Sequence, residues 1–100
     1  PPDGYFDALQ AETRKRGILL RCDEEQTAFG RLGHWFAASH LNVTPDLLTV
    51  SKTLGGGIPL AGVITTDAIE DACHARGFAF YTSHVSDPLP ATVGLAVLVS

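Results

Sequence analysis

The sequence predicts an α/β domain built as a layered sheet with helices. Helical and strand-like segments alternate along its 100 residues, which is typical of α/β layers. Short apolar runs of strand length, such as 18–22 and 47–50, are bounded by turn-forming or charged residues. Hydrophobic residues make up 45% of the chain, so the composition favours a packed core over disorder.

Each element follows from a local pattern. Residues 3–16 fit a helix, because Asp3 is a typical cap, basic residues close the segment and a glycine follows it. The run 18–22 fits a buried strand that ends at three carboxylates, and a strand opened by Asp46 leads to Lys52. The remaining elements, in chain order, are a loop at 27–33, a short helix through 35–38, a turn at 42–45, a strand at 61–65, a helix from Asp67 to Arg76, a strand at 78–81, a polar loop at 82–90 and a helix from near Pro90.

Composition also bounds the class of function. The net charge is −4, which gives no basic surplus for nucleic acid or for an anionic membrane surface. No run reaches the length of a membrane span. The two cysteines and four histidines have no metal-ligand spacing, so we expect reduced thiols and surface or packing histidines in a cytoplasmic protein. The chain has no methionine and starts with two prolines, so we expect a segment of a longer protein.

The strongest chemical signal is Lys52. An apolar strand leads to it, and the glycines 55–57 follow shortly after. A lysine at the end of a buried strand is partly desolvated, and desolvation makes the free amine more available for covalent chemistry. We therefore interpret Lys52 as a Schiff-base lysine; the ordinary alternative is a surface lysine.

Asp23 is the expected partner of Lys52, because parallel strands would bring the two strand ends to one edge of the sheet. A lysine-bound pyridoxal phosphate needs a protonated ring nitrogen, and a buried aspartate beside that nitrogen keeps the proton there. Gln26, three residues further on, has an amide that can donate to the ring oxygen or to a substrate carboxylate. The alternative is a strand-end aspartate that caps a turn, followed by a solvated glutamine.

A second polar cluster lies at 82–87. Its hydroxyls and carboxylate suit a phosphate or a hard cation, although turn-forming residues are the ordinary explanation. The glycines at 55–57 match neither the dinucleotide nor the Walker pattern, and no serine lies in a nucleophile elbow.

Two of these stretches resemble one family. Residues 23–31, Asp-Glu-Glu-Gln-Thr-Ala-Phe-Gly-Arg, resemble the D-E-x-Q-T-G-x-G-R signature of class III pyridoxal-phosphate-dependent aminotransferases, and 45–52 resembles their cofactor-lysine motif. Within the class, residues 80–90 are most similar to 2,2-dialkylglycine decarboxylases. Ordinary class III aminotransferases carry an H-G-S-T-F-G-G-N-P-like stretch at this place instead. The chain departs from the pattern at Ala28, which replaces a glycine, at Leu32, which replaces a threonine, and at Ser83, which also replaces a threonine.

The resemblance implies a fold-type I transferase, with residues 1–100 as the central segment of a large domain whose mostly parallel sheet is flanked by helices. The small domain and the N-terminal part would lie outside this chain. Lys52 would bind pyridoxal phosphate and move protons, Asp23 would pair with its pyridine nitrogen, and Gln26 would contact its ring oxygen or the substrate carboxylate. Ser83 would bind the cofactor phosphate of a neighbouring subunit in a homodimer or homotetramer.

The decarboxylase resemblance also implies an alkali-metal ion, potassium or sodium, bound by Ser83, by the carbonyl of Val85 and by Asp87. The implied reaction is decarboxylation of 2,2-dialkylglycines coupled to transamination of a keto acid such as pyruvate. Two alternatives stay open: a class III aminotransferase acting on ω-amino or α-amino substrates, and an inactive piece without catalysis of its own.

Overall fold

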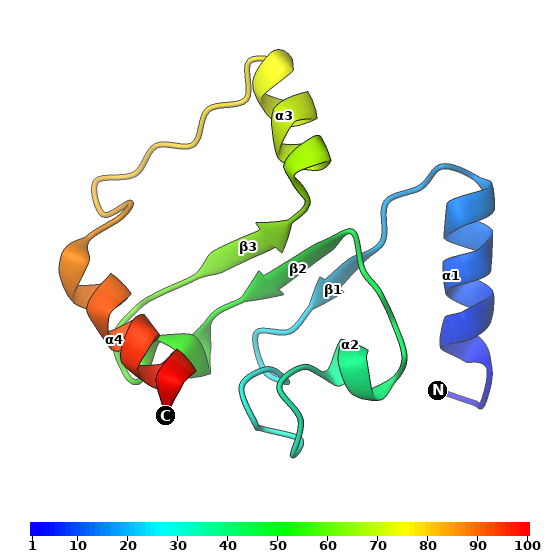
Figure 1. Cartoon of the computed structure of the whole chain (residues 1–100), viewed down its shortest axis with the longest axis horizontal. Coiled ribbons are helices and arrows are strands. Elements are labelled where there is room, and N and C mark those ends of the chain that lie inside the picture. Colours follow the sequence, from blue (N-terminus) through cyan, green and yellow to red (C-terminus); the bar gives the residue numbers. More distant parts are fainter.

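The computed structural model describes residues 1–100 and contains helices and strands in alternation (Figure 1). The helices lie at the periphery and the strands at the centre. None of the helices combines the length and hydrophobicity needed to cross a bilayer. The elements in chain order are α1 (Tyr5–Lys15), β1 (Arg21–Asp23), α2 (Ala37–His40), β2 (Leu47–Val50), the 3₁₀ helix η1 (Lys52–Gly55), β3 (Gly62–Thr65), α3 (Asp67–Ala75) and α4 (Pro88–Val99).

The strands form one sheet in the order β1-β2-β3. β1 and β2 run parallel, and β2 and β3 run antiparallel. Asp46 fixes the start of the parallel pair, because its carboxylate accepts the Leu20 N–H at 2.7 Å and its own N–H donates to the Leu20 carbonyl at 2.8 Å. The α/β expectation is confirmed, and the parallel arrangement that matters for the site is present, whereas β3 makes the sheet of these residues mixed.

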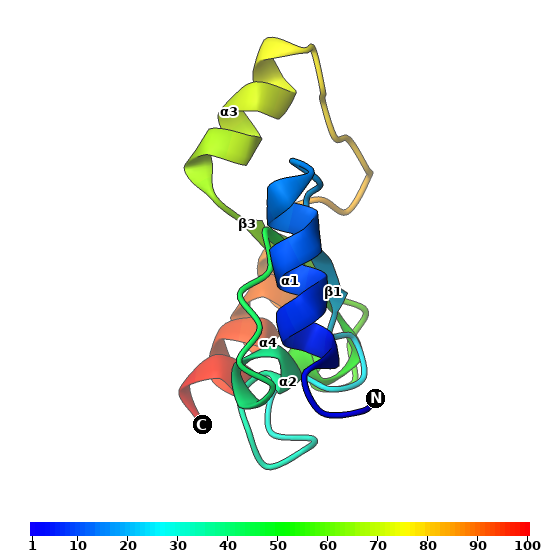
Figure 2. The same cartoon turned by 90° about the vertical axis from the view of Figure 1, so that its right-hand side faces the viewer.

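α1 is held against the chain that enters β2. The Gln10 side chain, only 8% exposed, donates to the carbonyl of Asn42 at 3.2 Å and accepts the N–H of Thr44 at 2.9 Å. This pair of bonds satisfies backbone groups in the turn before β2. Figure 2 shows α1 standing upright beside that turn.

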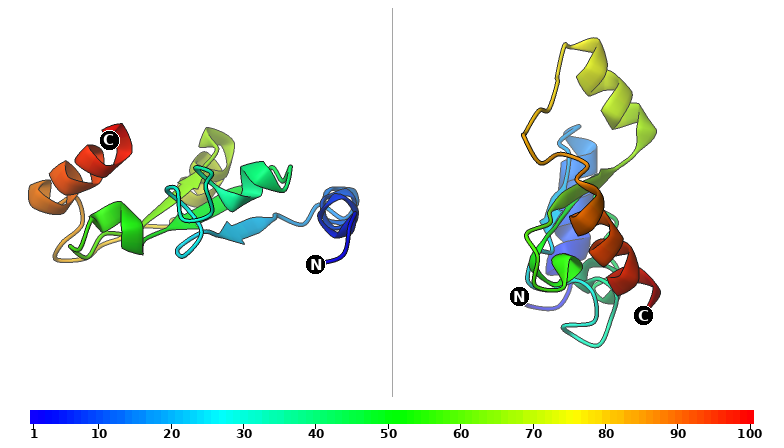
Figure 3. Two further views of the ribbon diagram at one scale, coloured as in Figure 1. Left: turned by 90° about the horizontal axis from the view of Figure 1, so that it is seen from below. Right: turned by 90° about the vertical axis from the view of Figure 1, so that its left-hand side faces the viewer.

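The chain forms a thin plate rather than a closed globule (Figure 3). Its principal extents are 41 × 38 × 17 Å and its radius of gyration is 15.3 Å, against about 13 Å for a compact domain of this length. Only nine of the 100 residues are buried, and five of them are hydrophobic. Three of these, Ala28, Val50 and Leu54, pack together as one cluster. Large apolar side chains are exposed along the whole plate, among them Ile18, Leu19, Val63, Ile64, Phe78, Phe80, Leu89, Leu95 and Val99. Surfaces of this kind mark contacts with other protein parts.

α4 packs on η1 through a close approach at Gly56. This residue has φ +54°, and a side chain there would meet Val93 at 3.2 Å and Val97 at 3.3 Å. Glycine is therefore required at this position both by its backbone angle and by the space available.

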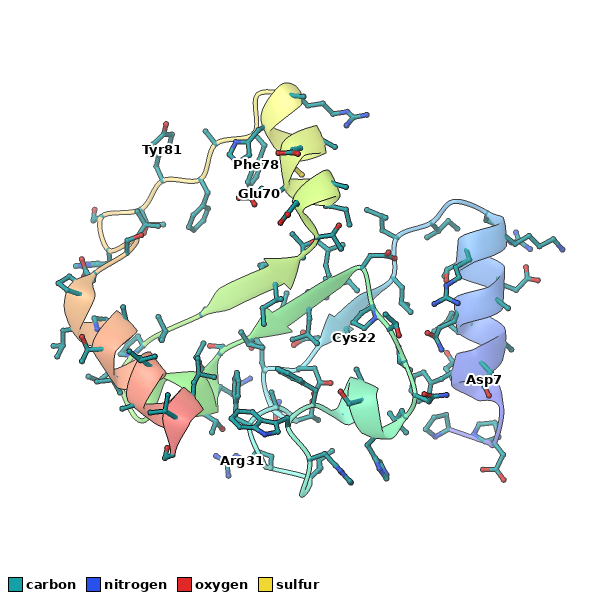
Figure 4. The ribbon with its side chains drawn as sticks, viewed as in Figure 1. Asp7, Cys22, Arg31, Glu70, Phe78 and Tyr81 are labelled. Carbon is teal, nitrogen blue, oxygen red and sulfur yellow. The ribbon has the colours of Figure 1, made fainter.

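Two predicted strands differ clearly from the structure, and the strand that leads to Lys52 ends two residues before it, at Val50. The strand predicted at 18–22 begins at Arg21 and includes Asp23, while Ile18 and Leu19 are more than half exposed. The segment 78–81 forms no strand, although Phe78 and Tyr81 suit one by composition. It has no neighbouring strand to pair with, and Tyr81 points away from the rest of the molecule (Figure 4).

Helix boundaries differ by a few residues. α1 begins at Tyr5, after Gly4 rather than Asp3, and Thr66 rather than Asp67 precedes α3. α4 begins at Pro88, two residues before the predicted start. Proline is favoured at the first helical position, because the N–H it lacks would have no helical partner there.

Candidate functional site

The ends of β1 and β2 meet at one edge of the sheet. Asp23 pairs in register with Thr49, and the N–H of Glu24 donates to the Thr49 carbonyl at 2.9 Å. Lys52 follows three residues after Thr49. The expectation that the two strand ends share an edge is confirmed, and carboxyl edges of parallel strands are the common place for ligands in α/β sheets.

Lys52 has an unusual backbone. It is the first residue of η1 and has φ +47°, in the left-handed region that side chains other than glycine rarely adopt. Strained backbone of this kind concentrates at functional positions, because the surrounding structure must hold it. Here β2 stops at Val50, and the chain turns at Ser51 directly into a 3₁₀ helix.

The predicted desolvation of Lys52 is wrong for the chain as folded here. The side chain is 51% exposed, and its Nζ lies 3.0 Å from Oε2 of Glu25. Lys52 lies beyond the end of β2, at the first residue of η1, and it is not part of the apolar cluster formed by Ala28, Val50 and Leu54. An exposed ion pair therefore stands where we expected a buried amine.

Asp23 and Gln26 are both exposed, so the expected burial of Asp23 is also not found. One carboxylate oxygen of Asp23, Oδ1, accepts the N–H of Glu25 at 3.2 Å, and the other has no hydrogen bond within the chain. This local bond turns the chain so that Glu25 faces Lys52. The Gln26 side chain makes no hydrogen bond within the chain.

Glu24 is the residue that sequence reasoning missed. Its side chain is 2% exposed, and its carboxylate accepts the Ala37 N–H at 3.0 Å, the Ala38 N–H at 2.6 Å and the hydroxyl of Thr27. These bonds join the end of β1 to the start of α2 and close the loop between them. Glu24 is the fixed glutamate of the D-E-x-Q signature, but its partners could not be found from spacing, because the bonded groups are 13 and 14 residues apart.

The buried carboxylate also affects its neighbour. Cys22 is half-buried on β1, and its thiol has a pKa raised above the ordinary value of 9.0, first by burial and second by the negative charge of Glu24. Cys22 is therefore a protonated, weakly reactive thiol at neutral pH.

The loop between β1 and α2 accommodates Ala28 without strain. The left-handed residues of the loop are Phe29, with φ +58°, and Gly30, with φ +86°. Ala28 itself is outside that region and is 2% exposed in the core, so the replacement of glycine costs no backbone strain. Arg31, labelled on this loop in Figure 4, donates from Nε to the Thr53 hydroxyl at 3.1 Å and links the loop to η1.

The polar loop at 82–87 forms its own contacts. Nδ1 of His84 lies 2.8 Å from Oδ2 of Asp87, and both residues line an open hollow of about 480 Å³ together with Val85. Ser83 is exposed and does not line it, so the hollow brings together two of the three predicted ion ligands. None of Lys52, Asp23 and Gln26 lines this hollow.

A larger open hollow, of about 1030 Å³, lies between the β1–α2 loop and the end of α4, and it contains none of the predicted site residues. His34 and His40 stack there with ring centroids 4.1 Å apart. All four histidines of the chain are exposed, which fits the surface roles expected for them.

Comparison with known proteins assigns a family. The model of the class III aminotransferase family matches residues 1–100. An uncharacterized aminotransferase from Schizosaccharomyces pombe is 52% identical over 97% of this chain and 22% of its own length. A leucine/methionine racemase from Thermococcus litoralis is 40% identical over 98% of this chain and 22% of its own length.

A solved structure gives the same result for the fold. It is that of taurine:2-oxoglutarate aminotransferase from Bifidobacterium kashiwanohense, in complex with pyridoxal phosphate (PLP) and glutamate. It superposes with a TM-score of 0.89 at 33% identity, over 98% of this chain and 22% of that one. The chain thus spans about a fifth of the length of the proteins it matches. Because the family model covers every residue, this chain belongs to the class III aminotransferase family.

Proposed function

We propose that the protein containing these residues is a pyridoxal-phosphate-dependent enzyme that passes amino groups between amino acids and keto acids. Residues 1–100 would be the central segment of its cofactor-binding large domain. The observation that carries the proposal is the shared strand edge, where Asp23 ends β1 and Lys52, with its left-handed backbone, follows β2. Membership of the class III family supports the same reading.

The residues present at that edge fit the cofactor. The Lys52 amine is accessible enough for an aldehyde to reach it, and one Asp23 carboxylate oxygen is free of hydrogen bonds. Lys52 would hold the cofactor covalently and move a proton at the substrate's α-carbon. Asp23 would keep a proton on the pyridine nitrogen by placing a negative charge beside it. The cofactor, when bound, supplies the electron sink for this chemistry.

Gln26 and Ser83 would complete the contacts from this chain. Both are exposed, and the Gln26 side chain is free of internal hydrogen bonds, so its amide is available to the ring oxygen or to a substrate carboxylate. Ser83 would donate its hydroxyl to the cofactor phosphate held by a second subunit, in a homodimer or homotetramer.

Replacement of Lys52 tests this proposal. Lys52→Ala in the full-length protein should abolish the visible absorbance of the bound cofactor and the transfer of amino groups. Lys15→Ala removes the other lysine of the chain, which lies on α1, and should leave both unchanged. Retention of absorbance and turnover by Lys52→Ala would reject the assignment.

A second, finer proposal is that the enzyme decarboxylates 2,2-dialkylglycines before it transaminates a keto acid such as pyruvate. Support comes from the sequence of residues 80–90, which is similar to dialkylglycine decarboxylases. An alkali-metal ion at Ser83, Val85 and Asp87 belongs to this proposal, and His84 contacts only Oδ2 of Asp87, which leaves Oδ1 for the ion. The relative that is a racemase shows that proteins this similar differ in reaction type.

The rival to decarboxylation is a plain aminotransferase acting on ω-amino or α-amino substrates. Release of carbon dioxide from 2-aminoisobutyrate by the full-length protein would favour the decarboxylase, and its rate should then differ between potassium and sodium. Amino-group transfer from an ω-amino or α-amino acid without carbon dioxide would favour the rival.

A third candidate is that the 100 residues alone have no catalytic activity. This candidate is favoured because only nine residues are buried, and a core of this size supplies little stability. Apolar side chains of the sheet and of α4 are also exposed in the isolated chain. The isolated chain should melt without cooperativity and bind the cofactor weakly. A sharp thermal transition with tight cofactor binding would contradict this.

A further inference from the structure

The contact between Lys52 and Glu25 differs from every other ion pair of the chain. Each of the other four joins residues three or four positions apart. The Lys52–Glu25 pair joins residues 27 positions apart, from the end of β1 to the start of η1, with Nζ donating to Oε2 at 3.0 Å. It therefore depends on the fold and not on helical spacing.

Both partners are held in place by their backbone. The Glu25 N–H donates to Asp23, which directs the glutamate across the strand edge. Lys52 is fixed by the left-handed start of η1, and η1 is tied to the β1–α2 loop through Arg31 and Thr53. The family signature leaves the position of Glu25 open, so this carboxylate is a feature of this chain and not a requirement of the motif.

The contact opposes the chemistry proposed for Lys52. An ammonium has no lone pair and cannot attack a carbonyl, so the lysine must lose a proton before it reacts. The Glu25 carboxylate, at hydrogen-bonding distance, occupies one of the three N–H donors of the Lys52 ammonium, and this bond must break before the nitrogen can react. Glu25 therefore competes with any aldehyde for the same nitrogen.

We propose that Glu25 is a positioning residue that holds the Lys52 ammonium whenever that lysine is not bonded to the cofactor, and so sets the rate of cofactor loading. The proposal rests on the proposed function of Lys52. During loading a bond forms between Nζ and the aldehyde carbon of pyridoxal phosphate, and the aldehyde oxygen leaves as water. The proton released from the ammonium passes to the Glu25 carboxylate or to solvent.

The first experiment tests the contact between Glu25 and Lys52 in the absence of cofactor, through the reactivity of the Lys52 amine. Full-length protein stripped of cofactor is labelled with a trace of an amine-reactive reagent, and the label on Lys52 is compared by mass spectrometry with that on Lys15 in the same molecule. For a half-exposed pair, Glu25→Gln should raise the Lys52/Lys15 ratio about two- to fivefold. Glu70→Gln, which removes another exposed carboxylate that contacts no lysine, should leave it unchanged. An unchanged or lower ratio in Glu25→Gln would overturn the proposal.

The second experiment separates contact from long-range charge. The rate at which cofactor absorbance develops is measured after pyridoxal phosphate is added to the same stripped proteins. Glu25→Gln and Glu25→Asp should both load about two- to fivefold faster, because the shorter aspartate keeps the charge but loses the contact. Faster loading of Glu25→Gln alone would indicate general repulsion of the anionic cofactor and would overturn the proposal. So would equal or slower loading of both.

Failure of the proposed function gives a different pattern. If Lys52 is not the cofactor lysine, Lys52→Ala loads like the parent protein, and the Glu25 variants change the labelling ratio without changing the loading rate. That result would overturn the loading role of Glu25 while confirming its contact with Lys52.

Discussion

Replacement of Glu24 by alanine should open the loop between β1 and α2. The substitution removes the acceptor of the Ala37 and Ala38 N–H groups and of the Thr27 hydroxyl, and leaves these donors unpaired in a site where the original side chain is 2% exposed. Hydrogen bonds to charged groups contribute about 1.5–3 kcal/mol each. Two backbone bonds, one of them at the half-buried Ala37, therefore place the local loss at about 2–4 kcal/mol.

Hydrogen exchange on the full-length protein measures this directly. Because each tenfold change in an equilibrium constant is about 1.4 kcal/mol, a loss of about 2–4 kcal/mol in local opening free energy corresponds to roughly 30- to 1000-fold faster amide exchange. The amides of Ala37 and Ala38 should show this faster exchange, and those of α3, which follows β3 later in the chain, should not, because local openings act on contiguous units.

The matched control is Glu12→Ala on α1. The Glu12 carboxylate is half exposed and pairs with Arg16 at 3.0 Å. Loss of this exposed ion pair should change the exchange rates of the Ala37 and Ala38 amides by about twofold or less. Unchanged protection at Ala37 and Ala38 in Glu24→Ala would refute the reasoning, since it would mean that the loop closes without the carboxylate.

Two further predictions follow from the packing and the thiol. Because burial and a nearby negative charge raise the pKa of Cys22, its thiol should react with iodoacetamide more slowly than the Cys73 thiol at pH 8. The difference between the two reaction rates should narrow as pH rises above 9.0. Equal rates at pH 8 would contradict the raised pKa of Cys22. The folded state holds the thiol proton more tightly than the unfolded state, so the contribution of Cys22 to stability is complete below 9.0 and is lost as pH rises through the higher folded value. Gly56→Ala should lower the stability of the full-length protein towards urea by about 1–3 kcal/mol, because the alanine has left-handed strain and also contacts Val93. Gly77→Ala is the control: Gly77 has φ +79° and open space around it, so this variant has the strain alone. Equal losses of stability in the two variants would show that packing against α4 contributes nothing.

The shared strand edge was predictable because its determinants are local. Asp23 and Lys52 each follow an apolar run of strand length, and two such runs with a helix between them favour parallel pairing. The sequence also indicated the helices correctly to within a few residues, since glycine, proline and charge patterns mark their ends.

Burial at the site was not predictable in the same way. Whether Lys52 and Asp23 are buried depends on which other segments of the fold pack on the strand edge. The local pattern of apolar and polar residues does not indicate these distant contacts. The same reason applies to 78–81, where aromatic residues favour a strand but no partner strand lies beside them. The burial of Glu24 and its hydrogen bonds could not be predicted, because its backbone partners lie 13 and 14 residues away in an apolar stretch.

Chemical trapping of the cofactor tests the assignment of Lys52 most directly. The full-length protein is loaded with pyridoxal phosphate, reduced with borohydride to make the cofactor–lysine bond permanent, digested and analysed by mass spectrometry. The account predicts that the pyridoxyl group is found on the peptide that contains Lys52. A modified peptide that contains Lys15, or any lysine outside these residues, with Lys52 unmodified, would contradict it.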